Sequence, residues 1–265
     1  MRMRTHVMSE NYTALASKIL ELSCDKTVIY VPNGGNWGDG IIREATLRFF
    51  DDFSIGYHEL PFINSFWKEY IKMPLMREYL SNKVLVFGGG GAWYPVFSSG
   101  YNFICHYHKF FKHTVVLPST LMFCLDSADV TFFCRDLYES KQYCSQAFFC
   151  HDMAFYLFDK ITSENLSTGQ TGYFFRTDRE SLGKQNYIAL NMDISLWGNE
   201  ITPIAPFIKK IDEFDIIHTD RLHVAILACL LHKRVHFYKG GYFKNEAVFR
   251  SSMKDYFDDV FMKNY

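Results

Sequence analysis

Arg221 and His223 stand two residues apart, directly after a short apolar run in the second half of the chain. Residues 214–217 have the composition of a buried strand in a parallel sheet. Apolar residues then recur at helical spacing over residues 222–230, which predicts a core helix. We therefore expect Arg221 and His223 in the first turn of a helix, just past the carboxyl end of a strand.

This position favours work on an anion. In open α/β sheets ligands bind at the carboxyl ends of the strands, where the N–H groups of a helix terminus attract negative charge. A fixed cation, Arg221, and a titratable imidazole, His223, on such a platform suggest an anionic substrate. The alternative is structural: Arg221 pairs with a carboxylate and His223 caps a turn.

Two glycine-rich segments follow expected strands in the first half. Residues 27–31 read as a strand that runs into Pro-Asn-Gly-Gly-Asn-Trp-Gly-Asp-Gly (residues 32–40) and then a helix. This loop is neither a GxGxxG fingerprint nor a P-loop, yet its glycines let backbone N–H groups approach a ligand. The carboxylate of Asp39 either binds a sugar hydroxyl or acts as its general base, or else Asp39 is the N-cap of the helix. Residues 83–87 read as another strand, followed by four glycines (88–91). Trp93 and Tyr94 come next, and they form either a stacking wall for a sugar or lid packing.

Further charged residues stand at the ends of expected strands. Arg135 follows the strand over 130–134, and Arg176 lies in the strand that begins at residue 172. A short strand is also expected over 187–190. The metal-like group at residues 105–108 lies in an expected helix, where positions two apart do not share a face, so we predict no metal site.

Strands and helices alternate throughout, which predicts an α/β fold with parallel sheets. The polar stretch 161–171 is the best candidate for a linker. We expect two Rossmann-like domains that face a cleft, over residues 1–160 and 172–265, with a helical stretch over 62–80 kinked at Pro74.

Composition limits the classes of function. A formal charge of −1 at pH 7 provides no basic field for nucleic acid. No apolar run is long enough to span a bilayer, and no apolar segment of a signal peptide follows the basic N-terminus. The seven cysteines are expected as reduced thiols. The predicted protein is cytoplasmic, either free or peripherally associated with the inner face of the cytoplasmic membrane.

Several of these stretches together resemble the polysaccharide pyruvyltransferase family. The matching segments, in chain order, are Gly-Asn-Trp-Gly-Asp (35–39), the four glycines (88–91), Arg135-Asp136 with Ser140, Asp-Met-Ala (152–154), Phe-Arg-Thr-Asp (175–178) and Thr-Asp-Arg-Leu-His (219–223). The family is similar in fold to GT-B glycosyltransferases, and it transfers the pyruvyl group of phosphoenolpyruvate to sugar hydroxyls as a ketal, without a metal.

The resemblance implies a role for each matching residue. His223 would be the catalytic acid, and Arg221 with Arg176 would bind phosphoenolpyruvate, which is a substrate and not a cofactor. The remaining substrate-binding residues would be Leu222, Asn36, Asp39, Gly89, Gly90 and Arg135. The acceptor would be a saccharide, free or lipid-linked, bound by the first domain. Two other functions stay open at this point: a nucleotide-sugar glycosyltransferase and a non-catalytic saccharide-binding protein.

Overall fold

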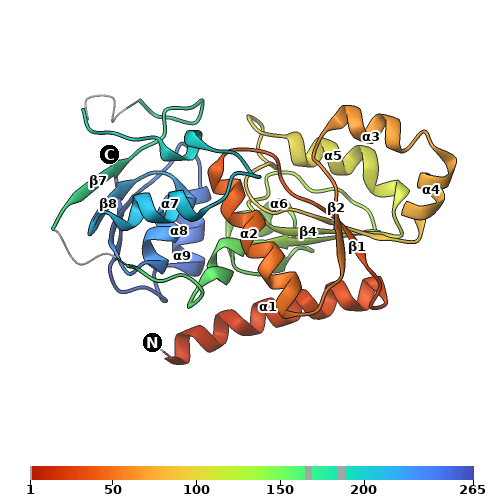
Figure 1. Cartoon of the computed structure of the whole chain (residues 1–265), viewed down its shortest axis with the longest axis horizontal. Helices are drawn as coiled ribbons and strands as arrows, with labels where there is room; N and C mark the ends of the chain where they lie inside the picture. The colour runs from red at the N-terminus through yellow and green to blue at the C-terminus, as the bar shows by residue number, and fades with distance from the viewer. Residues whose placement is uncertain (1, 165–168, 184–188) are drawn as a thin grey trace. The chain divides into compact units, whose positions relative to one another are not determined.

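The computed structural model describes residues 2–164, 169–183 and 189–265. It confirms the α/β class with parallel sheets (Figure 1). By internal contacts the chain divides into two units. The N-terminal unit comprises Arg2–Gly34 and Thr46–Met153, and the C-terminal unit comprises Gly35–Ala45 and Ala154–Tyr265. The expected boundary between residues 160 and 172, and the cleft, remain predictions.

The N-terminal unit is built on a six-stranded sheet in the order β2-β1-β3-β4-β5-β6, in which each strand runs parallel to its neighbours. Its central strands are buried on both faces, as in doubly wound folds. The order reverses between β1 and β3, so the segments after these two strands meet at the switch point. The strands are β1 (Val28–Val31), β2 (Tyr57–Glu59), β3 (Val84–Phe87), β4 (His113–Ser119), β5 (Val130–Cys134) and β6 (Phe148–Phe149).

Helices pack on this sheet through a largely aromatic core. Trp67 is fully buried and contacts the rings of Phe103, Tyr107 and Phe111. The high aromatic content of the chain therefore serves packing in this unit. The helices are α1 (Arg2–Ser23), α2 (Trp37–Asp52, whose first residues belong to the C-terminal unit), α3 (Asn64–Tyr70), α4 (Pro74–Ser81), α5 (Ser99–Tyr107), the short 3-10 helix η1 (His108–Phe110) and α6 (Glu139–Tyr143).

The C-terminal unit contains a parallel four-stranded sheet in the order β10-β9-β8-β7. Burial alternates along β7 and β8, so one face of the sheet is covered and the other is partly open. Figure 1 shows α7, α8 and α9 together beside these strands. The elements are η2 (Met153–Leu157, which begins at the last residue of the N-terminal unit), β7 (Thr171–Phe174), η3 (Ile194–Trp197), α7 (Ala205–Asp212), β8 (Ile216–Thr219), α8 (Leu222–Leu230), β9 (Arg234–Tyr238), α9 (Lys244–Ser252) and β10 (Val260–Lys263).

Most predicted elements are present, with shifted ends. The stretch expected as one kinked helix over 62–80 forms two helices, because Pro74 begins α4 at a position that needs no N–H donor. Of the strand expected over 187–190, residues 187 and 188 lie outside the described residues, and residues 189–190 form a turn. The last strand before the key helix lies at 216–219 instead of 214–217.

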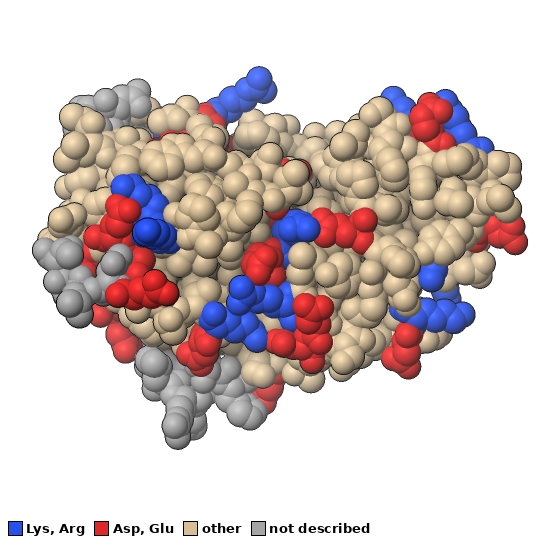
Figure 2. Space-filling model, in the orientation of Figure 1, with Lys and Arg blue, Asp and Glu red and all other residues tan. Residues whose placement is uncertain are grey.

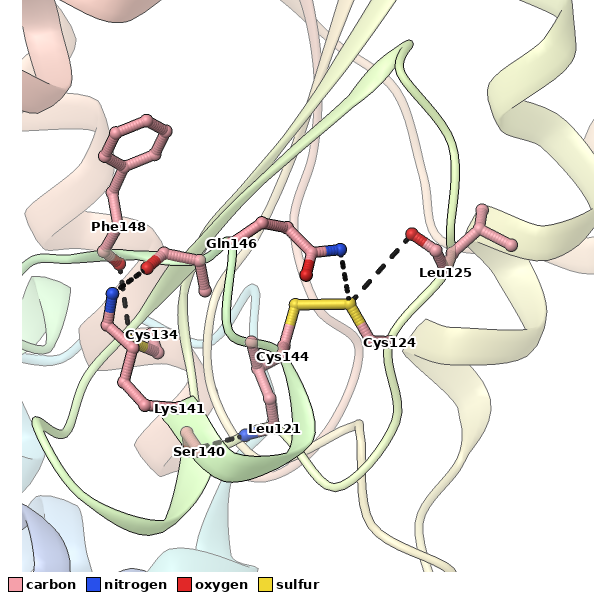
Figure 3. Close-up of a disulfide and its surroundings, with 10 residues drawn as sticks. Leu121, Cys124, Leu125, Cys134, Ser140, Lys141, Cys144, Gln146 and Phe148 are labelled. Atoms are coloured by element: carbon pink, nitrogen blue, oxygen red, sulfur yellow. Dashed lines mark hydrogen bonds between the residues drawn. A yellow bond between two sulfur atoms is a disulfide. The ribbon is translucent and has the colours of Figure 1, made fainter.

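The expectation of seven reduced thiols is wrong for two of them. Cys124 and Cys144 are joined by a disulfide (Figure 3), with Cα atoms 5.2 Å apart. The side-chain amide of Gln146 contacts the sulfur of Cys124 at 3.0 Å. The fold brings together the segment after β4 and the end of α6, which a separation of 20 residues in the sequence does not reveal.

Charges of both signs are mixed on the molecular surface. Figure 2 shows Lys and Arg atoms next to Asp and Glu atoms on the visible face, in keeping with the formal charge of −1. Across the described residues, no helix combines the length and apolar character that crossing a membrane requires.

Candidate active site

The strand-to-helix junction predicted around Arg221 is present. β8 ends at Thr219 and α8 begins at Leu222, with Arg221 as the N-cap residue in an extended conformation. The hydroxyl of Thr219 accepts the Arg221 N–H at 2.9 Å and donates to the carbonyl of Phe174 at 2.6 Å. The Thr219 side chain therefore fastens the junction to β7. Leu222 is buried at the first position of the helix.

Arg221 is held by carboxylates. Its Nε and Nη2 atoms donate to the two oxygens of Asp193 at 2.8 and 2.6 Å, and its Nη1 lies 2.8 Å from Asp178 Oδ2. The side chain is 5% exposed. Burial acts to lower the pKa of Arg221, but hydrogen bonding and the negative charge of Asp193 outweigh it and raise the pKa. The observed geometry of Arg221 is therefore that of the structural alternative, in which it pairs with a carboxylate.

Arg176 shares a carboxylate with Arg221. Its Nε and Nη2 contact both oxygens of Asp178 at 2.9 and 3.1 Å, and its Nη1 pairs with Glu180, which also accepts from Lys244. Burial tends to raise the pKa of Asp178, but the two guanidinium groups lower it on balance. We call the group the arginine–carboxylate cluster; its members are Arg176, Asp178, Glu180, Asp193 and Arg221.

Asp220 ties the surrounding strands and the chain end to this cluster. Its Oδ1 accepts the backbone N–H of Arg176 at 2.8 Å, and its Oδ2 accepts the hydroxyl of Tyr265 at 2.7 Å. Its backbone carbonyl accepts the side-chain amide of Asn245 at 2.8 Å. Burial raises the pKa of the Asp220 carboxyl, although its hydrogen bonds from Tyr265 and from the backbone of Arg176 act against this rise. The residue between Thr219 and Arg221 therefore has a positioning role.

His223 lies against the start of α2. A Cβ built on Gly38 would come within 2.5 Å of His223 Nδ1 and 3.0 Å of Asn36 Oδ1. Only a glycine leaves room for the imidazole at this point. Residues 35–45 and His223 belong to the same unit, so the structure brings the Gly-Asn-Trp-Gly-Asp segment to the Arg-Leu-His segment despite their distance in sequence.

Asn36 and Asp39 form a reciprocal cap on α2. The Asn36 side-chain oxygen accepts the N–H of Gly38 at 2.8 Å, and Asp39 Oδ2 accepts the N–H of Asn36 at 3.0 Å. This is the arrangement of a capping box, with Asn and Asp in the usual Ser/Thr and Glu places. Since α2 begins at Trp37, Asn36 is the N-cap residue and Asp39 is its partner at the third helical position, so the expected N-cap position of Asp39 is wrong although its side chain does cap the helix. The role of Asp39 toward a sugar remains a prediction.

The glycines after β3 allow close approach of protein backbone. A Cβ on Gly88 would meet the backbone N of Asn33 at 2.5 Å, and one on Gly89 would meet the carbonyl of Pro118 at 2.4 Å. Gly90 has φ of +116°, which favours glycine. The neighbouring Trp93 is buried against Phe132 and Tyr101, so it packs the core and forms no sugar-stacking wall.

Arg135 is 1% exposed and lies in the N-terminal unit. Its Nη1 pairs with Asp152 Oδ2 at 2.6 Å, and its Nε donates to the hydroxyl of Thr120 at 2.8 Å. Asp136 next to it accepts the N–H of Ser140 at 3.0 Å. Arg135 and Asp136, which match a segment of the family, therefore join the end of β5 to Thr120, Ser140 and Asp152. The contact of Arg135 with a substrate remains a prediction, and in this structure the guanidinium group is engaged in a buried ion pair.

Sequence reasoning missed Asp193, the bidentate partner of Arg221. It also accepts the N–H of Thr177 at 2.7 Å and the Thr177 hydroxyl at 2.9 Å. Its signal was weak: one carboxylate in a short polar stretch that precedes no recognisable motif. The metal-like group at 105–108 serves its own helix, since His106 and His108 each bond a backbone carbonyl four residues earlier. Within the described residues no group of three or more His, Cys, Asp or Glu could hold a metal ion.

A comparison with known protein families supports the resemblance that the matching segments indicated. The family model for polysaccharide pyruvyl transferase matches residues 36–239. That range includes Asn36, His223 and the whole arginine–carboxylate cluster. The chain belongs to the polysaccharide pyruvyl transferase family.

A solved structure resembles this one along nearly its whole length. It is the crystal structure of a functionally uncharacterized protein from Klebsiella pneumoniae, with 29% sequence identity and a TM-score of 0.76. The match covers 96% of this chain and 98% of the other. A comparison with curated proteins finds no match.

Proposed function

We propose that the protein transfers the pyruvyl group of phosphoenolpyruvate to two hydroxyls of a saccharide, forming a pyruvate ketal and releasing phosphate. The saccharide would be a precursor of a surface or extracellular polysaccharide. Membership of the family supports pyruvyl transfer. The observation that carries the donor is that Arg176 and Arg221 converge on one carboxylate, Asp178, at the ends of β7 and β8.

Donor binding would replace one carboxylate by another. Asp178, at 21% side-chain exposure, is the most accessible of the carboxylates that face Arg221. Phosphoenolpyruvate carries a carboxylate and a phosphate, and planar guanidinium groups suit both. If Asp178 turns away, the carboxylate of the donor finds the two guanidinium groups already placed. The buried partner Asp193 would continue to hold Arg221 in position.

The reaction requires a proton at C3 of the donor. His223 would supply it, which turns the methylene into a methyl group and makes C2 electrophilic. A saccharide hydroxyl oxygen then bonds to C2 and loses its proton. A second hydroxyl oxygen bonds to the same carbon as the C2–O bond to phosphate breaks; its proton leaves with the phosphate, and the cyclic ketal remains. In this scheme the arginines bind the donor anion and His223 moves the proton.

Donor identity is tested by thermal unfolding with phosphoenolpyruvate, UDP-sugars and GDP-sugars, because a ligand of the folded state raises the melting temperature. We expect a rise with phosphoenolpyruvate alone. A rise with only a nucleotide sugar would identify a glycosyltransferase instead. Saccharide binding without a donor response would identify a binding protein. Turnover in excess chelator is expected to persist; its loss and return with Mg²⁺ would contradict the proposal.

The role of His223 is tested by substitution. His223→Ala and His223→Gln should keep the melting-point response to phosphoenolpyruvate but lower turnover by about 10²–10⁴, the usual contribution of a positioned acid. His58→Gln, at an exposed histidine of the N-terminal unit, is the matched control and should change neither. Near-normal turnover in either His223 variant would exclude it as the acid. Solvent deuterium should enter the pyruvyl methyl group during wild-type turnover.

A further inference from the structure

The turn between α3 and α4 exposes apolar side chains in sequence. Met73 is 47% exposed, Leu75 is 74% exposed, and Pro74 between them is also exposed. The helices on both sides of the turn are anchored in the core, because Trp67 of α3 and Leu80 of α4 are fully buried. Met73, Pro74 and Leu75 are therefore held between two helices that pack on the core. Scattered apolar residues are ordinary on a surface, but a projecting group of neighbours usually serves an interaction.

Positive charge surrounds this turn. Lys68 on α3, Lys72 in the turn and Arg77 on α4 are exposed. Lys72 pairs with Glu69 at 2.6 Å, and Glu78 is exposed on α4. Arg77 donates to the carbonyl of Ile71 at 3.3 and 3.1 Å, so it is held at the turn.

Aromatic rings accompany further cations at the same end of the N-terminal unit. Lys83 lies over the ring of Tyr79, and Lys109 and Arg77 lie over the ring of Phe110. The α4 helix packs on η1, which carries Lys109 and Phe110. Five cations thus stand near three carboxylates, Glu59, Glu69 and Glu78, in a chain whose formal charge is −1. A tyrosine ring beside a lysine, as at Tyr79 and Lys83, is typical of the boundary between lipid headgroups and water.

A cavity of about 410 Å³ opens beside the same helices. Its walls are mostly apolar or aromatic: Leu60, Tyr70, Met76 and Tyr79, with Ile29. His58 and Glu59 provide its polar groups. The hollow thus continues the mixed apolar and polar surface of the α3–α4 region.

We propose that the α3–α4 turn docks on a membrane surface containing anionic lipid, with Met73 and Leu75 inserted among the acyl chains. The positive surroundings complement anionic headgroups and the apolar tip complements the chain region. A second copy of the chain is a poorer occupant, because stable interfaces bury about 800 Å² on each partner and the turn offers three neighbouring residues. The inference goes beyond the proposed reaction and does not depend on it.

Vesicle co-sedimentation tests the docking. The full chain should bind phosphatidylcholine vesicles that contain phosphatidylglycerol, bind them less at high salt, and bind pure phosphatidylcholine vesicles weakly. Leu75→Glu should lower the partition coefficient at least about tenfold, because it loses apolar burial and adds a like charge to the anionic surface. Leu190→Glu is the matched control, since Leu190 has the same 74% exposure in the C-terminal unit. Lys72→Gln should weaken binding about fivefold.

Each other result overturns the proposal. These are absence of vesicle binding, binding indifferent to Leu75→Glu, or equal loss with Leu190→Glu. Size-exclusion chromatography separates the remaining case: a dimer that Leu75→Glu dissociates would show that a second copy covers the turn. Circular dichroism and the melting temperature of each variant show whether it is folded. Vesicle binding needs neither donor nor acceptor, so its failure leaves the proposed reaction intact, and the reverse also holds.

Discussion

Replacing Gly38 by alanine would test whether the position of His223 matters. The new Cβ would lie 2.5 Å from Nδ1 of the imidazole, and ordinary contact begins near 3.4 Å. The ring must therefore move by about 1 Å, or the start of α2 must shift. The cap oxygen of Asn36, 3.0 Å from the same Cβ, must yield by a few tenths of an ångström.

The expected effects on stability and on turnover differ. Alanine is favoured over glycine in a helix by up to about 1 kcal/mol, while overpacking costs about 1–3 kcal/mol, so the net change in unfolding free energy should be a modest loss. A displacement of about 1 Å at a reacting group can lower the rate about 10²-fold. We expect Gly38→Ala to unfold near the wild-type temperature, to bind phosphoenolpyruvate almost normally, and to turn over about 100 times more slowly.

Three measurements check this expectation. Phosphate release from phosphoenolpyruvate with a saccharide acceptor gives the turnover, thermal unfolding gives the stability, and the imidazole NMR signals of His223 report its displacement without any activity. Gly240→Ala is the control, because its Cβ would meet its nearest neighbour, Asn245 Nδ2, at an ordinary 3.5 Å. Full turnover by a folded Gly38→Ala variant with shifted His223 signals would refute the argument that the ring position is needed.

Four other outcomes are expected. Arg221→Ala should weaken phosphoenolpyruvate binding by about 1.5–3 kcal/mol in calorimetry and, by leaving a buried carboxylate unpaired, lower the unfolding free energy by about 3–5 kcal/mol; unchanged values of both would contradict the site. Burial lowers the pKa of His151 to about 4, so the unfolded chain binds this proton first and His151 should contribute a loss of about 3 kcal/mol as the pH falls from about 6.5 to 4; His218, whose pKa is lowered to about 4 as well, adds to the loss, so His151→Gln should lose about 3 kcal/mol less than the wild type over this range in denaturation. Asp39→Ala should lower stability by about 1 kcal/mol as a lost cap, and a fall in acceptor kinetics at unchanged stability would instead favour a sugar-binding role. Peptide mapping without reductant should recover the Cys124–Cys144 link, and reduction should lower the unfolding free energy by about 2–4 kcal/mol, whereas free thiols at both positions would exclude the bond.

The sequence alone determined much of the fold. Residues 130–134 and 234–238 appear as strands with the predicted ends. The first is a mostly apolar segment, as a strand buried in a parallel sheet requires, and the second alternates buried and more exposed residues, as a strand covered on one face requires. The helical spacing after Arg221 likewise predicted α8, because that helix is buried along almost all its length. The placement of Arg221 and His223 at a strand-to-helix junction followed from these two local patterns.

Other features depend on which segments meet in space, and local patterns do not contain that information. Asp193 pairs with Arg221 across 28 residues, and no periodicity relates them. The glycine of the Gly-Asn-Trp-Gly-Asp segment that contacts His223 lies 185 residues before it, so the clearance at Gly38 appears only in the folded chain. The four glycines after β3 suggested a ligand, yet the nearest atoms to two of them are protein backbone.

The balance of charge at the site was also decided by tertiary structure. The sequence identified the arginines as cations, but only the fold shows that Asp178, Glu180 and Asp193 surround them. A guanidinium group buried away from water needs such partners, because desolvation of an unpaired charge costs several kcal/mol. Residue type and spacing therefore located the strand-to-helix junction, whereas packing determined which groups hold Arg176 and Arg221 and which must move before an anion binds.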